Sequence, residues 1–503
     1  MRTTRSSYAA LLVALLLGGV AFAQQAPLPD ANAAAAQMQQ KLQRLSADLN
    51  AAQERLQQSE REIQRLQDEL ATLQAQVPGA APTAGAAGPV VASSSVPSAQ
   101  DTAEKVEVLQ AEVKTHEQIK VESASKYPVR LTGLVVFNAF INKGAVDNVD
   151  VPSVAIPQAP GVSNLATGAS IRQTILGIQA TGPRLFGAKS SAEVNLDFYG
   201  GIPYSNYGTD GGLVRMRTAA LRLTWDKDYA EVGLVEPIIS PLSPTSYASV
   251  SEPALAWAGN LWTWAPQLSY KHRFGSATAP HFAWQAALWD PPAAGYNTGD
   301  VFRAPSAGER SAQPAYETRL SFARDDKADG LQVGLSGYYS RQSYTNRSGD
   351  SWAGTADWRL PVGRVFELSG EAYRGRALGG LGGGVYKDVV NGTDRVTGLA
   401  TFRLLNAAGG WAQAKFRLTP AIEANAAFGE DGGFSRDFHS LVLAGGGSNS
   451  QNRARNRMTT LNMVFAPKTY LILSPEFRRI WTWPVSGNAY TANLFTLSFA
   501  LRF

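Results

Sequence analysis

The sequence predicts an all-β transmembrane barrel of about sixteen antiparallel strands, preceded by an α-helical coiled coil. From residue 127 onward, apolar and polar residues alternate along segments that are each long enough to cross a bilayer as a strand. The connections between these segments alternate between short and long. Short periplasmic turns and long external loops are typical of outer-membrane barrels, in which one strand face meets lipid and the other meets water.

The N-terminus predicts a secretory signal peptide over residues 1–23. Arg2 and Arg5 precede an apolar stretch over residues 8–20, and Ala21-Phe22-Ala23 follows as a cleavage site. An N-terminal anchor helix is the alternative, but the stretch is shorter than the ~18–20 residues that a spanning helix needs. We therefore expect the mature protein to leave the cytoplasm.

Residues 31–77 predict a coiled coil because apolar residues recur at alternating steps of three and four. This seam consists of Met38, Leu42, Leu45, Leu49, Ala52, Leu56, Ile63, Leu66, Leu70, Leu73 and Val77. A single amphipathic helix packed on a domain is the alternative, and the number of strands in the coil stays open. Residues 78–100, rich in Pro, Gly, Ala and Ser, predict a flexible linker, and 101–126 predict a second helical segment.

The barrel is expected over residues 127–503. Its last strand shows the pattern, with Phe495, Leu497, Phe499, Leu501 and Phe503 alternating with more polar residues. Sixteen strands are expected near 129–141, 171–181, 189–199, 213–225, 229–235, 262–274, 281–290, 314–324, 331–341, 351–360, 365–376, 411–418, 421–429, 455–466, 469–479 and 491–503. Residues 396–405 could add a hairpin and give eighteen strands, but we place them in a long loop.

Composition excludes several classes of function. With no cysteine, the chain has no disulfide, thiolate nucleophile or Cys-ligated zinc, and its net charge of +5 is too mild and spread out for nucleic acid. His439-Ser440 lies in a predicted loop and His272 and His281 flank a turn, which does not amount to a catalytic triad. The glycine-rich run 379–384 opens no predicted helix, so a loop is favoured over a phosphate site. We expect no enzyme activity, metal or cofactor.

A barrel of sixteen or eighteen strands is too wide for its side chains to fill, so we expect an aqueous channel. Residues 128–503 contain 27 Arg and 8 Lys against 28 acidic residues, a net charge of +7. An excess of Arg suits bidentate recognition of anions, although a GC-rich genome would also explain it. The candidate pore-lining residues are Arg222, Lys271, Arg319, Arg359, Lys415, Arg417, Arg502, Glu193, Asp197 and Glu423.

Arginines near the external strand ends conflict with this pattern, because they share the register of the lipid-facing residues. They are Arg215, Arg217, Arg374, Arg376, Arg455 and Arg457, with Arg479 in the same position on its strand. A β-bulge on each strand would turn them into the lumen. We favour one shared outward orientation at the external rim, where they could bind lipopolysaccharide phosphates or pair at subunit contacts.

Three stretches resemble DcaP-type and related phosphate-selective porins: RQTILGIQATGP from Arg172, AEVNLDFYGG from Ala192, and RMRTA from Arg215. The Trp262-Thr263-Trp264 stretch departs from the pattern of that group. The terminal Phe503 resembles the signal that the outer-membrane assembly machinery reads. The resemblance implies a trimeric outer-membrane porin with its coiled coil in the periplasm, which lets small anions such as dicarboxylates or phosphate-like anions diffuse.

The function expected from these observations is passive diffusion of small hydrophilic solutes, with moderate anion selectivity. The expected partners are small anionic solutes, outer-membrane lipid and lipopolysaccharide, other copies of the chain, and peptidoglycan or a periplasmic protein at the coiled coil. A structural or adhesive envelope protein, anchored by the barrel and tethered by the coiled coil, is the alternative. By analogy with other porins, we expect residues 236–261 to fold inward.

Overall fold

The computed structural model describes residues 127–202, 211–294, 304–327, 329–344, 347–443 and 452–503. These residues all belong to the second of two units in the chain, Ser98–Phe503. The predicted signal peptide, coiled coil, linker and second helical segment lie outside the described residues. No described helix has the length and apolar character needed to cross a membrane.

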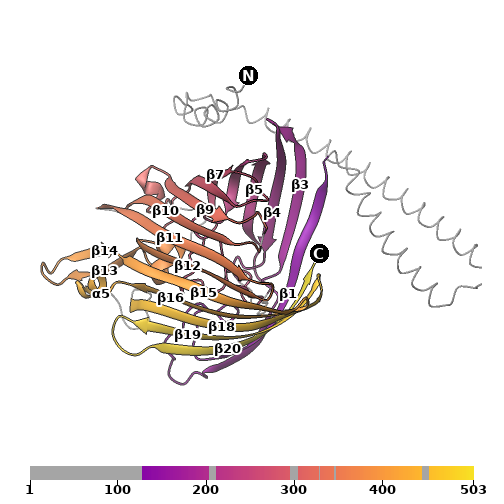
Figure 1. Cartoon of the computed structure of the whole chain (residues 1–503). Coiled ribbons are helices and arrows are strands. Elements are labelled where there is room, and N and C mark those ends of the chain that lie inside the picture. Colours follow the sequence, from indigo (N-terminus) through magenta and orange to yellow (C-terminus); the bar gives the residue numbers. More distant parts are fainter. Residues whose placement is uncertain (1–126, 203–210, 295–303, 328, 345–346, 444–451) are drawn as a thin grey trace, which may run out of the picture. The chain divides into compact units, whose positions relative to one another are not determined.

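One antiparallel sheet of seventeen strands dominates the described part of the chain (Figure 1). Its first nine strands are β1 (Val129–Lys143), β2 (Leu165–Ser170), β3 (Ile175–Leu185), β4 (Ala188–Asp197), β5 (Arg215–Thr224), β6 (Asp228–Val235), β7 (Ala265–Phe274), β8 (His281–Trp289) and β9 (Ala315–Ala323). The others are β10 (Gln332–Ser343), β11 (Ser348–Val362), β12 (Phe366–Arg376), β15 (Asn406–Thr419), β16 (Ile422–Gly433), β18 (Arg453–Lys468), β19 (Leu471–Pro484) and β20 (Tyr490–Arg502).

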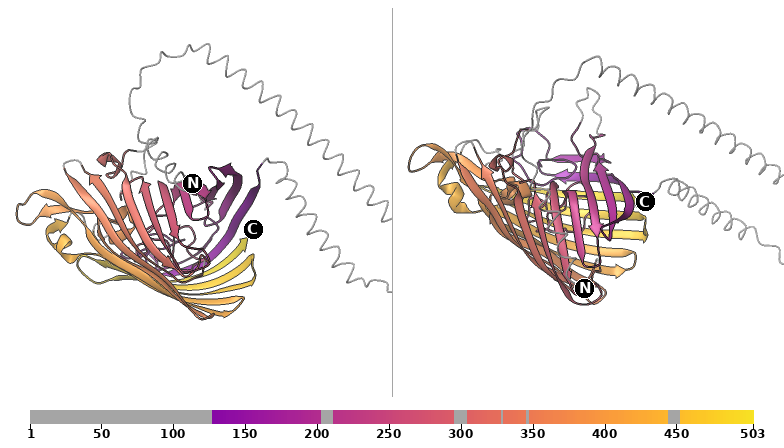
Figure 2. Two further views of the ribbon diagram at one scale, coloured as in Figure 1. Left: turned by 45° about the horizontal axis from the view of Figure 1, so that its top comes forward. Right: turned by 90° about the horizontal axis from the view of Figure 1, so that it is seen from above.

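The sheet closes into a barrel because β1 pairs with β20, from Leu134↔Arg502 to Lys143↔Asn493 (Figures 1 and 2). On its other edge, β1 pairs with β2 along one half and with β3 along the other. β2 and β3 are thus one strand position interrupted at residues 171–174. Seventeen strands therefore occupy sixteen positions, which confirms the expected sixteen over eighteen.

The alternation of side chains explains why these segments form a barrel wall. On β18, Leu461, Met463 and Phe465 are exposed, whereas the alternate residues Thr460 and Asn462 are buried. A row of exposed apolar side chains on one face of a strand is what a bilayer requires of an outward surface. At one end of the barrel all connections are short, for example that between β15 and β16, whereas the other end carries the long connections together with two short ones, β10–β11 and β19–β20.

Two long connections, β12–β15 and β16–β18, together form a small sheet from β13 (Val389–Asp394), β14 (Ala400–Leu404) and β17 (Leu441–Leu443). The short elements of the long connections are η1 (Glu309–Ser311), η2 (Gly379–Leu381), α4 (Gly383–Tyr386) and α5 (Ser435–His439). Residues 396–405 thus lie in a long connection outside the barrel wall, as expected, although Ala400–Leu404 pair with β13 as one arm of a hairpin there. At the end of the glycine-rich run, the amides of Gly384 and of the following Val385 donate to the Asp431 carboxylate at 3.1 and 2.6 Å, so these two amides already have an anionic partner from the protein itself.

Candidate functional site

Residues 236–264, which connect β6 to β7, fold into the barrel and line its inner wall. We call them the inward segment. Side chains from several parts of the wall accept hydrogen bonds from its backbone: Glu317 from the Ile238 amide (2.9 Å), Glu371 from the Leu242 amide (2.8 Å), Gln413 from the Thr245 amide (2.7 Å) and Gln173 from the Val250 amide (2.6 Å). These anchors come from β9, β12, β15 and the interruption between β2 and β3. The expectation that residues 236–261 fold inward is confirmed.

Apolar packing supports the same segment where it crosses the wall. Leu242, Leu255 and Ala258 lie in one buried cluster with Trp411 of β15 and Met458 of β18. Part of the inner wall is therefore apolar and covered by the inward segment. The rest of the inner wall carries charged side chains. A simple alternation of a lipid face with a wet face does not describe this barrel, because one internal face packs against a folded chain.

An irregularity in β5 sets the orientation of two arginines. Asn195 of β4 pairs with Thr218, but its neighbour Leu196 pairs with Met216. Arg217 therefore has no pairing partner on β4 and is the extra residue of a β-bulge. Thr218 and Arg217 both face the lumen, and the alternation restarts on the other side of the bulge.

Arg215 and Arg217 lie inside the barrel, so the expectation that they point outward is wrong. Both bind Asp197 Oδ2, at 2.6 and 3.0 Å, and the Asp197 side chain is fully buried. Arg215 also donates to the Ser251 carbonyl (2.7 Å) and Arg217 to the Val250 carbonyl (2.8 Å). The bulge thus turns two arginines that share the register of the lipid-facing residues toward the lumen, where they bind the backbone of the inward segment.

The other rim arginines face outward. No register shift separates β12 from its neighbours, and Arg374 and Arg376 share the phase of the exposed Trp352. Arg455 and Arg457 bind the two Glu430 oxygens at 3.5 and 2.6 Å. Arg479, on the same face of β19, lies over the Trp481 ring.

The pore-lining candidates, apart from Asp197, lie toward the short-turn end of the inner wall. With their acidic partners they form what we call the charged belt: Glu193, Arg222, Glu231, Lys271, Arg319, Asp357, Arg359, Glu367, Lys415, Arg417, Glu423 and Arg502. The ion pairs join neighbouring or next-neighbouring strands: Arg222 with Glu193 and Glu231 (both 2.6 Å), Arg319 with Asp357 (2.7 Å), Arg417 with Glu367 (2.7 Å), Arg359 with Glu367 (4.0 Å), and Lys415 with Glu423 (3.4 Å).

Two cations of the charged belt have no carboxylate partner among the described residues. Lys271 faces inward from β7 beside Gln267 and Ser269 in the alternation of that strand, and neither an ion pair nor a hydrogen bond joins it to a described side chain. Arg502 contacts only the hydroxyl of Tyr247, at 3.3 Å. Every carboxylate of the belt is paired, so its seven cations and five anions leave a net charge of +2.

A cavity of about 460 Å³ opens on the arc of the wall between β3 and β7. Charged and polar side chains line it, including Glu193, Arg217, Arg222 and Glu236, together with Trp264. The Trp264 ring lies under the Arg217 guanidinium, at 4.7 Å. Reasoning from the sequence missed Glu236 and Trp264 as lining residues, although Trp264 lies in the stretch that departs from the porin pattern.

Side chains that could carry hydrolytic chemistry are scattered. His272 faces outward from β7 and binds Asp228 at 2.7 Å, and His281 lies near Asp326 at 3.1 Å. His439 contacts Ser435 on α5, outside the barrel wall. In the described ranges, no three His, Asp or Glu side chains gather as a metal site would require.

The chain is similar in fold to porins of known structure. No family model matches it, and no curated protein matches it in sequence. The outer membrane channel DcaP of Acinetobacter baumannii superposes with a TM-score of 0.56 and 15% identity, over 75% of this chain and 99% of that one. An anion-selective porin from Comamonas acidovorans gives 0.47 and 14%, over 75% and 100%, and OprB of Pseudomonas putida gives 0.44 and 11%, over 75% and 94%. At such identities the likeness concerns the fold alone.

Proposed function

We propose that this protein is a passive channel of the outer membrane, through which small hydrophilic solutes diffuse with a moderate preference for anions. A closed sixteen-position barrel with an apolar outer face supports the membrane location. The inward segment narrows the interior and leaves a polar cavity along β3–β6. This arrangement suits a channel rather than an enzyme.

The net charge of the charged belt carries the anion preference. In a narrow passage with low-dielectric walls, unbalanced fixed charge raises the local concentration of the opposite ion. Paired residues such as Lys415 and Glu423 largely cancel each other, so the excess comes from Lys271 and Arg502. Small anions such as dicarboxylates or phosphate-like ions are the solutes that such a passage would favour.

Reversal potentials across planar bilayers in a salt gradient test this proposal. The double variant Lys271→Gln/Arg502→Gln removes the +2 excess and should move the reversal potential toward the value of an unselective pore. Lys227→Gln, which removes an exposed cation from the short turn between β5 and β6, is the matched control and should leave it unchanged. A cation-selective wild type, or an unchanged double variant, overturns the anion preference.

Absence of conductance would overturn the channel itself. A protein that inserts as a folded barrel but passes no current would favour the alternative, an envelope anchor with a coiled-coil tether. The measurement therefore separates the two functions directly.

We also propose a homotrimer whose N-terminal coiled coil lies in the periplasm. The heptad seam over residues 31–77 supports self-association there. Deleting residues 31–77 should leave a folded barrel but lower the temperature at which the oligomer dissociates, or release a peptidoglycan or protein partner. Identical oligomer stability and identical envelope partners would contradict this role.

A further inference from the structure

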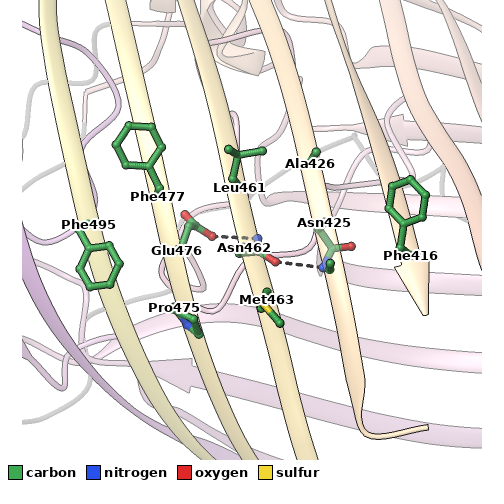
Figure 3. A pocket seen from close by; sticks show the side chains of 11 residues that line it. Phe416, Asn425, Ala426, Leu461, Asn462, Met463, Pro475, Glu476, Phe477 and Phe495 are labelled. Atoms are coloured by element: carbon green, nitrogen blue, oxygen red, sulfur yellow. Dashed lines mark hydrogen bonds between the residues drawn. The ribbon is translucent and has the colours of Figure 1, made fainter. Parts of the chain in front are cut away.

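An apolar groove lies on the outward face of β15–β20. Its volume is about 390 Å³, and Figure 3 shows its lining side chains. Small residues, Ala426 and Pro475 among them, lie between the larger Phe416, Phe477 and Phe495. The groove is thus a shallow apolar recess on a surface that faces lipid.

The outward arginines lie on the same strands and the same face, toward the long-loop end. Arg457 is four residues from Leu461 of the groove along β18, which is about 13 Å of strand. Arg479 is two residues from Phe477 along β19. A single elongated amphiphile could therefore touch both features.

Aromatic rings hold these guanidinium groups flat against the wall. The Arg455 guanidinium lies 4.0 Å from the centre of the Trp483 ring, and that of Arg457 lies 5.2 Å from it. Arg479 lies 4.8 Å from Trp481. Stacked guanidinium groups keep their N–H edges available and lose little freedom when they bind a planar or tetrahedral anion.

Carboxylates do not balance this charge. Arg455 and Arg457 share Glu430, and the described residues provide no carboxylate partner for Arg479. Arg374, on β12, donates to backbone carbonyls and the Asn406 side chain and lies over the Phe434 ring, and no ion pair joins it to a carboxylate among the described residues. The external part of this face is therefore cationic, while the part below it is apolar.

Small residues separate the arginines of β12 from those of β18. Arg374 pairs with Ala408, Ala408 with Gly432, and Gly432 with Arg455, so the four residues form one row across four strands. Three strand spacings make this row about 14 Å wide. A sugar-sized headgroup with two phosphates matches the width of this row better than a single small ion does.

We propose that this face binds lipopolysaccharide, with its lipid A phosphates on Arg374, Arg455, Arg457 and Arg479 and one acyl chain in the groove. This rests on the proposed outer-membrane location, in which the long loops face outward. Charge complementarity selects a polyanionic amphiphile. A second copy of this chain is disfavoured as the occupant, because its surface would have to supply the carboxylates that these arginines lack.

The test measures lipopolysaccharide retained by the purified full-length protein after extraction in detergent. The triple variant Arg455→Gln/Arg457→Gln/Arg479→Gln should retain about tenfold less, the equivalent of losing one charge-assisted contact. Arg184→Gln/Lys227→Gln/Arg324→Gln makes the same change of charge at the short-turn end and should retain the wild-type amount. Ala426→Phe, which fills the groove without altering charge, should also weaken retention.

Added lipids identify the chemistry. Purified lipid A should compete with bound lipopolysaccharide, whereas dephosphorylated lipid A and phosphatidylglycerol should compete poorly. Equal retention by the two triple variants overturns the proposal. Loss of the oligomer in the arginine variant with retention unchanged assigns the face to a second copy and also overturns it. Conductance in bilayers free of lipopolysaccharide should survive the arginine changes, so a failed channel and a failed lipid site give different results.

Discussion

The external ends of β5 and β18 carry the same pattern, an Arg-x-Arg followed by alternating apolar residues, yet their arginines face opposite sides of the wall. In β5 the bulge at Arg217 brings both arginines inside, onto the buried Asp197. In β18 the pairing with β16 is continuous, and Arg455 and Arg457 lie outside on Glu430. One extra residue in a strand therefore decides whether a charge serves the interior or the membrane surface.

The inward segment is consequently held differently at the two places. Near β5, arginine side chains donate to its carbonyls at Val250 and Ser251. Near β18, it packs through Leu255 and Ala258 onto Met458, and Asn456 donates to the Trp257 carbonyl at 3.0 Å. Charge-assisted hydrogen bonds hold the inward segment near β5, whereas it is held mainly by apolar packing near β18. Changes of charge should therefore affect the first side most, and changes of side-chain volume the second.

The largest effect is expected from Asp197→Ala. This change leaves Arg215 and Arg217 without their carboxylate partner in a largely buried site, which should lower the free energy of unfolding by about 3 kcal/mol. Glu430→Ala, the equivalent change outside β18, should cost below about 1 kcal/mol because that pair is partly exposed. Urea titrations of the folded, heat-modifiable band in gels measure both. Equal costs would show that the inner pair has no special role.

Single deletions come next. Deleting Arg217 removes the bulge but keeps Arg215 opposite Asp197, so the barrel should assemble and lose the contacts of Arg217 with the Val250 carbonyl, the Asp197 carboxylate and the Trp264 ring. Deleting Arg457 reverses the alternation beyond it and turns Asn456 outward, which removes buried hydrogen bonds worth about 1–3 kcal/mol each. Folding yields should therefore fall further for the β18 deletion. The reverse order would contradict the assigned bulge.

Gly429→Ala tests the packed side. A Cβ at Gly429 would meet the Ala258 carbonyl oxygen at 2.1 Å, so the inward segment must shift, at about 1–3 kcal/mol. Gly354→Ala on β11 is the control, because a Cβ there meets nothing within 4 Å. Single-channel conductance should change in the first variant and not in the second. A wild-type conductance in Gly429→Ala would mean that this contact does not set the passage.

The smallest effect is expected from pH, through Glu252 of the inward segment. Burial and, to a lesser extent, the nearby Asp147 raise the pKa of Glu252 from 4.5 to about 7 against the lowering effect of Arg215. Ser153 donates to its carboxyl group at 3.4 Å. Because the folded pKa lies above the unfolded one, the stabilising contribution is complete below 4.5 and is lost as the pH rises through about 7.

Open-channel noise should therefore increase between about pH 5 and about pH 8, as the ionised Glu252 loosens the segment near β5. Glu252→Gln should remove this dependence, whereas Asp226→Asn, in an exposed turn, should preserve it. A pH dependence that survives in Glu252→Gln would assign it to another group.

Local patterns in the sequence were enough to predict the barrel and its sixteen strand positions, whereas the segment that folds inward was predicted by analogy with other porins. Period-two alternation and turn residues act over a few neighbours, so each strand position of the barrel wall can be recognised alone, whereas β13 and β17 of the small loop sheet were not predicted. The placement of residues 396–405 in a loop follows from the same kind of information. The coiled coil over residues 31–77 remains a prediction, because it lies outside the described residues.

Only the tertiary structure decided which charges are balanced and which way the rim arginines turn. Lys271 and Lys415 look alike in sequence, but cross-strand register gives Lys415 a carboxylate and leaves Lys271 without one. Arg215 and Arg455 also look alike in sequence, and only the pairing register with the neighbouring strand distinguishes them. Pairing across strands depends on residues far apart in the chain, and a one-residue bulge leaves no mark in composition or period.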